Sequence, residues 1–191
     1  MQSENVYIGD DKFQRFLDHY NCPAPLGVVK LRFAGAVCSP NPNLRPTDVI
    51  ASLFAENLQP RLTTKNEAEL FFKFFMGLWD EIFEQVRHNE VRLPPYLPET
   101  SREYWRELCR RRSEQLEGFW GGRSDLKISA GLAELIDSLS DLAALYLTLA
   151  GRLEKETNIE NLIAAVKNTD KTVNRAISFI IENTVLPRMT E

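Results

Sequence analysis

The chain has 191 residues, of which 43% are hydrophobic and 26% are charged, and its formal net charge at pH 7 is −4. This length is enough for one domain with a sizeable core, and the mild negative charge gives no general attraction to nucleic acid or to anionic membranes. An odd number of cysteines without close pairing (Cys22, Cys38 and Cys109) argues against a disulfide framework and favours reduced thiols in a cytoplasmic protein.

The first part of the chain is predicted to contain three helices. The opening residues, MQSENVYIGDD, have no basic stretch followed by an apolar run, so we expect no signal peptide. Asp10 or Asp11 can cap a short first helix, and Pro25–Cys38 fits a second helix that is apolar almost all round. After the turn NPNLRPT, the apolar residues of Val49–Leu58 predict a third helix that ends before Pro60. The second helix carries small residues that permit close helix contact: Gly27, Ala34 and Gly35.

Aromatic side chains are concentrated in Glu69–Phe83, ELFFKFFMGLWDEIF. Charged residues interrupt this stretch far short of the ~20 apolar residues that a bilayer helix requires. On a helical wheel its apolar side chains cover an arc of roughly 180°, so we expect a core helix packed against two or more neighbours, with a ligand groove as the alternative for some rings. Thr64 and Glu67 form a capping box at its start. The apolar face comprises Phe71, Phe72, Phe74, Phe75, Leu78, Trp79, Ile82, Phe83 and Val86.

A stiff connector, Arg92–Pro98 (RLPPYLP), follows the aromatic helix. Thr100 and Glu103 then supply a second capping box for a helix that stops near the glycine pair at 121 and 122. The connector therefore separates two helices that each carry their own start signal.

The last part of the chain predicts two long helices. Apolar residues recur at helical spacing from Leu132 to Leu153, and Thr157 with Glu160 makes a third capping box. The helix behind this box has an expected break at 168–170.

No stretch alternates with a period of two residues, and no repeat at a fixed period is present. The chain is therefore predicted to be all-α, a single compact domain of about seven or eight helices. We expect residues 1–122 to form an N-terminal helical core and residues 123–191 to pack on it, with a C-terminal subdomain as the alternative.

The helix after the connector is rich in arginine, which at first suggests nucleic acid. Three of these arginines (Arg102, Arg106 and Arg110) alternate with glutamates, and Glu107 reaches Arg111 at a spacing of four residues. A face of this kind is nearly neutral, so we expect no binding of nucleic acid.

Arg112 differs from the other arginines because it falls on the apolar face of its helix. At such a position an arginine must pair with a buried acid, extend its charge past its stem to solvent, or present its guanidinium in a cleft. Tryptophan and arginine are enriched at binding hot spots. We therefore expect a partner-binding surface around Arg112 with Trp105, Phe119 and Trp120, and the two structural roles of the arginine remain the alternatives.

Three segments carry a family resemblance: RFAGAVCSPNPNLRPTDVIASLF (Arg32–Phe54), MGLWDEIFEQV (Met76–Val86) and EQLEGFWGG (Glu114–Gly122). In this order they resemble the YecA/YgfB-like family of uncharacterised bacterial proteins, over about Val28–Gly122. The chain reads Lys-Leu-Arg-Phe at 30–33, where that family often has a His-Gly-Phe step. The resemblance implies an all-helical fold and transfers no catalytic residue.

Catalytic motifs are absent from the sequence: it has no phosphate-binding glycine loop, no Gly-x-Ser-x-Gly elbow and no His-Glu-x-x-His. His19 and His88 have no suitably spaced partners, so we expect neither a metal site nor a cofactor. Cys38 closes a helix, where the helix dipole disfavours a thiolate nucleophile. An enzyme whose site assembles from distant residues is still an alternative.

We therefore expect a non-enzymatic protein that binds another protein, as an interaction or adaptor module. The alternative is a small-molecule or nucleic-acid binder that uses a cleft of aromatic and arginine side chains, and an enzyme comes third. The sequence predicts no membrane association and leaves the partner and homo-oligomerisation open.

Overall fold

The computed structural model describes residues 5–39, 43–54, 59–98, 101–121, 130–185 and 187, without the side chains at 120, 121, 130–133, 135 and 136. These residues form seven α-helices and no strand, which confirms the predicted all-α fold. The helices are α1 (Asp10–His19), α2 (Leu26–Val37), α3 (Pro46–Ser52), α4 (Lys65–Arg87), α5 (Arg102–Gly121), α6 (Ala130–Lys155) and α7 (Glu160–Thr184).

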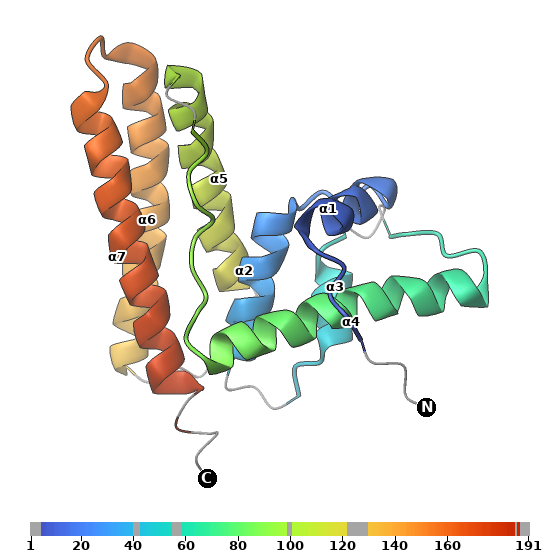
Figure 1. Cartoon of the computed structure of the whole chain (residues 1–191). Helices are drawn as coiled ribbons and strands as arrows, with labels where there is room; N and C mark the ends of the chain where they lie inside the picture. Colours follow the sequence, from blue (N-terminus) through green and yellow to red (C-terminus); the bar gives the residue numbers. More distant parts are fainter. Residues whose placement is uncertain are drawn as a thin grey trace.

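The helices are arranged as an upright bundle joined to a crosswise lobe (Figure 1). α5, α6 and α7 lie side by side in the bundle, while α4 extends away from it beneath α1 and α2. α5 packs along α6 on one side and along α2 on the other. The predicted boundary between residues 1–122 and 123–191 falls between α5 and α6, two helices that are packed together.

α2 and α5 approach closely enough for their backbones to touch. A Cβ atom added at Gly35 of α2 would lie 1.9 Å from the carbonyl oxygen of Phe119. One added at Gly118 of α5 would lie 2.9 Å from the carbonyl oxygen of Val28. The sequence-based expectation of a close helix contact at Gly35 is confirmed, and this contact fixes the bundle to the lobe.

The aromatic face of α4 forms the core of the lobe. The Phe75 ring is fully buried, with its centroid 5.4 Å from that of Phe13 and 5.3 Å from that of Phe16, both in α1. The predicted arc is too wide at its edges, because Phe72 and Phe83 are 40% and 39% exposed. The residues of α4 that are buried are Phe71, Phe75, Gly77, Leu78, Ile82 and Val86.

The starts of α4 and α5 use hydroxyl caps. Thr64 Oγ1 accepts a hydrogen bond from the Glu67 N–H at 3.1 Å, as the predicted capping box requires. The Glu67 carboxylate in turn accepts from the N–H and the hydroxyl of Thr63 and interacts with the backbone N–H of Thr64, as the predicted box requires. Thr100 lies outside the described residues, and Ser101 Oγ accepts from the Tyr104 N–H at 3.2 Å at the start of α5.

Two predictions for α7 are wrong. The helix begins at Glu160, three residues after Thr157, and it is Asn158 Oδ1 that accepts from the Glu160 N–H at 3.1 Å. α7 is continuous through 168–170. The Thr169 hydroxyl donates to the Ala165 carbonyl within the helix, and the buried Asp170 carboxylate accepts a hydrogen bond from Arg112.

The two shortest helices also differ from their predicted bounds. Gly9 is the N-cap of α1, with φ at 85°, a conformation that glycine adopts without strain. Asp10 and Asp11 lie in the first turn instead of at the cap, where their charges complement the helix dipole. α3 ends at Ser52, and residues 55–58 of the predicted third helix lie outside the described residues.

Candidate functional site

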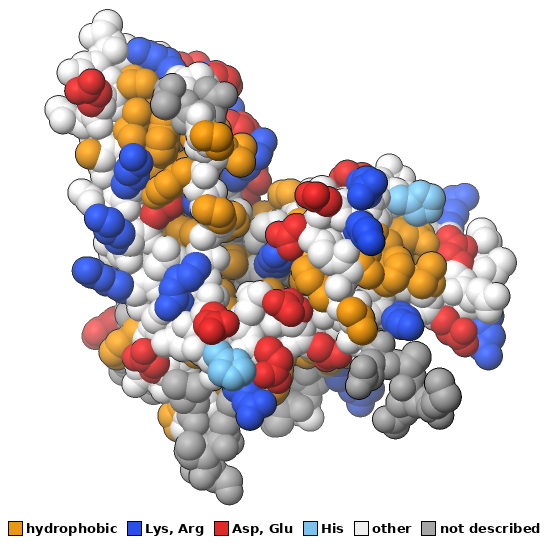
Figure 2. Space-filling model, viewed as in Figure 1, with side chains coloured by type: hydrophobic (Ala, Val, Ile, Leu, Met, Phe, Trp, Pro, Cys, Tyr) orange, Lys and Arg blue, Asp and Glu red, His pale blue; other side chains and the backbone are white. Residues whose placement is uncertain are grey.

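A cleft with a volume of about 620 Å³ lies between α1 and α2 on one side and the connector and α5 on the other, with part of α4 as its floor. Figure 2 shows it as the hollow between the upright bundle and the lobe. We call it the connector cleft. Among the described residues, those that line it include no aromatic residue, histidine or cysteine. They are Asp10, Gln14, Pro25, Leu26, Gly27, Val28, Lys30, Leu31, Glu81, Ile82, Gln85, Glu90, Val91, Arg92, Leu93, Pro94, Pro95, Arg111 and Gln115.

Side chains of α1 fix the position of α2 in one wall of the cleft. Lys30 Nζ donates to the Asp10 carboxylate at 2.7 Å, and the Tyr7 hydroxyl donates to the same carboxylate at 2.7 Å. Partial burial opposes the ionised form of Asp10, but the hydrogen bonds from Lys30 and Tyr7 outweigh it and lower the pKa of Asp10. Gln14 Oε1 accepts from the Leu26 N–H at 2.9 Å, at the start of α2. The charges of this wall are therefore paired before any ligand arrives.

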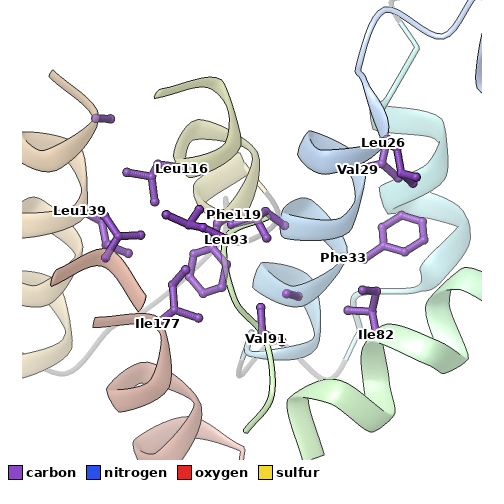
Figure 3. Packing of buried hydrophobic residues seen from close by; sticks show 14 of the residues in the cluster. Leu26, Val29, Phe33, Ile82, Val91, Leu93, Leu116, Phe119, Leu139 and Ile177 are labelled. Atoms are coloured by element: carbon purple, nitrogen blue, oxygen red, sulfur yellow. The ribbon is translucent and has the colours of Figure 1, made fainter. Parts of the chain in front are cut away.

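The opposite wall is the connector, which is tied to the bundle by side-chain hydrogen bonds. Arg112 Nη2 donates to the Pro94 carbonyl, and the Leu93 N–H donates to Asn174 Oδ1 at 2.9 Å. Gln115, which lines the cleft, accepts from Arg112 Nη1 at 3.0 Å. Figure 3 shows Leu93 packed beside buried side chains of the bundle. Arg112, which does not line the cleft itself, therefore fixes two residues of its wall, Pro94 and Gln115.

Arg112 belongs to a buried polar network in the bundle. Its side chain is 1% exposed, and its Nε and Nη2 atoms lie 3.2 and 3.1 Å from Asp170 Oδ2. The Tyr146 hydroxyl donates to Asp170 Oδ1 at 2.5 Å. Burial, followed by the charge of Asp170, raises the pKa of Cys109 to about 12, so this neighbouring thiol stays protonated. Of the three roles considered for Arg112, the structure shows pairing with a buried acid.

The four residues expected to bind a partner do not share one open surface. Arg112 and Phe119 are fully buried, and Trp105 is 4% exposed. The Trp105 ring reaches the connector, where its centroid lies 5.4 Å from that of Tyr96, itself 37% exposed. The Trp120 side chain lies outside the described residues. None of these three described side chains lines the cleft, only Arg112 is bonded to residues that do, and a direct role in binding stays a prediction.

The predicted salt-bridged face of α5 is confirmed in part. Arg111 Nε lies 3.1 Å from Glu107 Oε1, at the expected spacing of four residues. Arg102 instead donates to the carbonyls of Leu153 and Glu156, at 2.9 and 2.6 Å, and so links α5 to the end of α6.

Sequence reasoning did not identify the connector cleft. Its best signal was Lys30, which with Arg32 is one of two cations in an otherwise apolar helix, but the sequence did not indicate that Asp10 is its partner. Gln115 carried no signal, because its position on the wheel does not distinguish a cleft from a helix interface. The connector was predicted as a spacer, and its second role as a cleft wall follows only from the tertiary structure.

Among the described residues, no group of three or more His, Cys, Asp and Glu side chains could hold a metal ion. None of the described helices combines the length and the apolar character needed to cross a membrane. Comparison with protein-family models, with curated proteins and with solved structures found no match to this chain.

Proposed function

We propose that this protein acts by binding another protein, and that the connector cleft and its rim are the binding surface. The observation that carries this proposal is that hydrogen bonds hold both walls of the cleft before any partner arrives: Lys30 to Asp10 on one side and Arg112 to the Pro94 carbonyl on the other. A preformed site of this kind loses little conformational entropy on binding.

The lining of the connector cleft favours a protein over a small molecule or a nucleic acid. Small-molecule sites are lined mainly by apolar and aromatic groups, and single-stranded nucleic acids stack on aromatic rings. No aromatic side chain lines the cleft among the described residues, and its exposed lining residues include prolines and charged side chains, with the half-buried Gln14 and Gln85 beside them. Arg112, which would supply the positive charge of an aromatic and arginine cleft, is already paired with Asp170. A mixture of apolar and polar groups is typical of transient protein interfaces.

The proposal also covers the cellular compartment and the family of the protein. Cys22, Cys38 and Cys109 are not joined in disulfides, which supports a reducing compartment such as the cytoplasm. The all-α fold and the close contact between α2 and α5 are compatible with the resemblance to the YecA/YgfB-like family, and membership of that family stays a prediction.

Charge reversal inside the connector cleft tests the proposed function. Glu81 and Glu90 are exposed and line the cleft, whereas Asp141 is an exposed acid of α6 outside it. The double variant Glu81→Arg/Glu90→Arg, the control Asp141→Arg and the parent would each be used to capture proteins from the native cells. Each captured protein would then be purified and its complex with the parent measured by analytical ultracentrifugation.

We expect a partner that binds the parent and the Asp141 control but not the cleft variant, while all three proteins melt at similar temperatures. Capture of the same proteins by the cleft variant and the parent would show that the connector cleft is not the binding surface.

A further inference from the structure

The connector has a sequence that dictates an extended conformation. Proline fixes φ near −65° at Pro94, Pro95 and Pro98, and a residue that precedes proline is restricted to the extended region. The structure has neither helix nor strand in this segment, which runs along the bundle (Figure 1). These restrictions favour the polyproline II conformation, in which residues three apart lie on the same face.

One of the three faces of this extended segment is attached to the bundle. Leu93 is 6% exposed, and three residues further on the Tyr96 ring packs on Trp105. The backbone is held as well, because the Leu97 N–H donates to the Tyr104 hydroxyl at 2.8 Å. Together with the hydrogen bonds at Leu93 N and the Pro94 carbonyl, this anchors the connector from its first half to its second.

The other two faces of the connector are turned to solvent. Pro94 and Leu97 share one face and Pro95 and Pro98 share the next, and all four are exposed, Leu97 by 64%. Arg92 lies three residues before Pro95 and is also exposed. Its guanidinium donates to the Val91 carbonyl at 2.7 Å and, among the described residues, forms no ion pair.

We propose that the connector is itself a ligand, presented to a partner domain that reads polyproline II segments through an aromatic-lined groove with an acidic pocket, as SH3 domains do. Domains of this class bind Pro-x-x-Pro segments in the polyproline II conformation, and here Pro95 and Pro98 have that spacing. The dipeptides Pro94-Pro95 and Leu97-Pro98 would fill two successive slots of the groove, and Arg92 would meet the acid. This inference rests on the proposed protein-binding function and specifies the chemistry of the partner.

The anchoring of the connector distinguishes this role from that of a simple spacer. A spacer requires stiffness, which the prolines supply, but stiffness does not require an exposed leucine and an exposed arginine at matching spacing. Hydrogen bonds from α5 and α7 hold the backbone at Leu93, Pro94 and Leu97, and they leave the side chains of Pro94, Pro95, Leu97 and Pro98 exposed. A flexible peptide loses conformational entropy when it binds, whereas the connector has already lost this entropy when the protein folds.

A titration with a purified domain tests the proposal. An isotope-labelled SH3 domain that binds arginine-first Pro-x-x-Pro peptides would be titrated with the whole protein and followed by nuclear magnetic resonance. The variants are Pro95→Ala/Pro98→Ala, which removes the spaced prolines, and Arg92→Glu, which reverses the charge. Pro23→Ala is the matched control, because Pro23 is exposed but lies in the loop before α2. Circular dichroism melting would confirm that each variant is folded.

We expect the parent and the Pro23 control to shift the resonances of the aromatic groove in a saturable way. The double proline variant and Arg92→Glu should each weaken binding by about tenfold or more, as expected for the loss of an interface hot spot.

Absence of binding by the parent, with the domain still binding its own peptide, would overturn the proposal. Equal binding by the parent and the double proline variant would also overturn it. Neither outcome touches the proposed function, which depends on the separate capture experiment with the Glu81→Arg/Glu90→Arg variant.

Discussion

Removal of the Arg112 guanidinium should be one of the most destabilising single changes in this protein. In Arg112→Met the apolar stem is kept, but Asp170, which is 5% exposed, loses its cation and retains the Tyr146 hydroxyl. Breaking a buried ion pair from one side typically costs about 3–5 kcal/mol. The Pro94 carbonyl also loses its donor. For a chain of this size the melting temperature should fall by about 2–4 °C for each kcal/mol.

The matched double variant Arg112→Met/Asp170→Leu separates the cost of an unpaired charge from the cost of lost packing. Replacement of both partners of a buried ion pair by apolar side chains is often neutral. Most of the lost stability should therefore return, apart from about 1–3 kcal/mol for polar groups of the network that are left unsatisfied, such as the Pro94 carbonyl. Urea unfolding of the parent, both single variants and the double variant gives the coupling free energy between the two residues. A loss below about 1 kcal/mol in Arg112→Met, or strictly additive single effects, would refute a buried and coupled pair.

Four further outcomes can be measured with the same protein. Phe75→Ala should lower the free energy of unfolding by about 3–5 kcal/mol, because it empties a fully buried ring site, and an unchanged urea midpoint would contradict its core role. Gly35→Ala should cost about 3 kcal/mol, since its Cβ would meet the Phe119 carbonyl oxygen and two backbones would have to separate; a melting temperature equal to that of the parent would show that α2 and α5 can move apart freely. Asp10 has a lowered pKa in the folded protein, so its contribution is present above its ordinary pKa of 3.8 and is lost as the pH falls through the lower folded value. Melting temperatures of the parent and of Asp10→Asn, measured between pH 2 and pH 6 (about two units either side of that value), should fall less at acid pH in the variant than in the parent. If the two melting temperatures fall in parallel, the ion pair of Asp10 with Lys30 does not stabilise the fold. Fluorescence anisotropy with DNA and RNA should show no appreciable binding at physiological salt, and salt-sensitive sub-micromolar affinity would contradict this.

The all-α fold could be predicted because its signals are local. The Thr64 cap marked the start of α4, and the helical spacing of its apolar residues, which runs to Val86, marked its end to within one residue. The edges of the apolar face were less predictable, since exposure of Phe72 and Phe83 depends on where neighbouring helices end. The break predicted at 168–170 was wrong for a related reason. A polar run was interpreted as a helix end, whereas Asp170 is held in the helix by a distant arginine.

The candidate site was harder to predict, because its parts interact only in three dimensions. The sequence identified Arg112 as unusual and named a buried acid as one explanation, but it could not indicate which acid. Lys30 and Asp10 are 20 residues apart, and nothing in their local sequence connects them. The cleft arises from the crossing of helices, and helix crossing depends on tertiary contacts such as the one at Gly35.

The pairing of Arg112 with Asp170 also has a consequence for the order of events during synthesis. The two residues are 58 positions apart, so the arginine leaves the ribosome well before its acid does. At translation rates of about 5–20 residues per second, the interval is roughly 3–12 s. During this time the guanidinium remains hydrated and the Pro94 carbonyl lacks its fixed donor. The connector thus takes up its final shape only after α7 has been made, and any partner that recognises this shape would bind finished chains in preference to nascent ones.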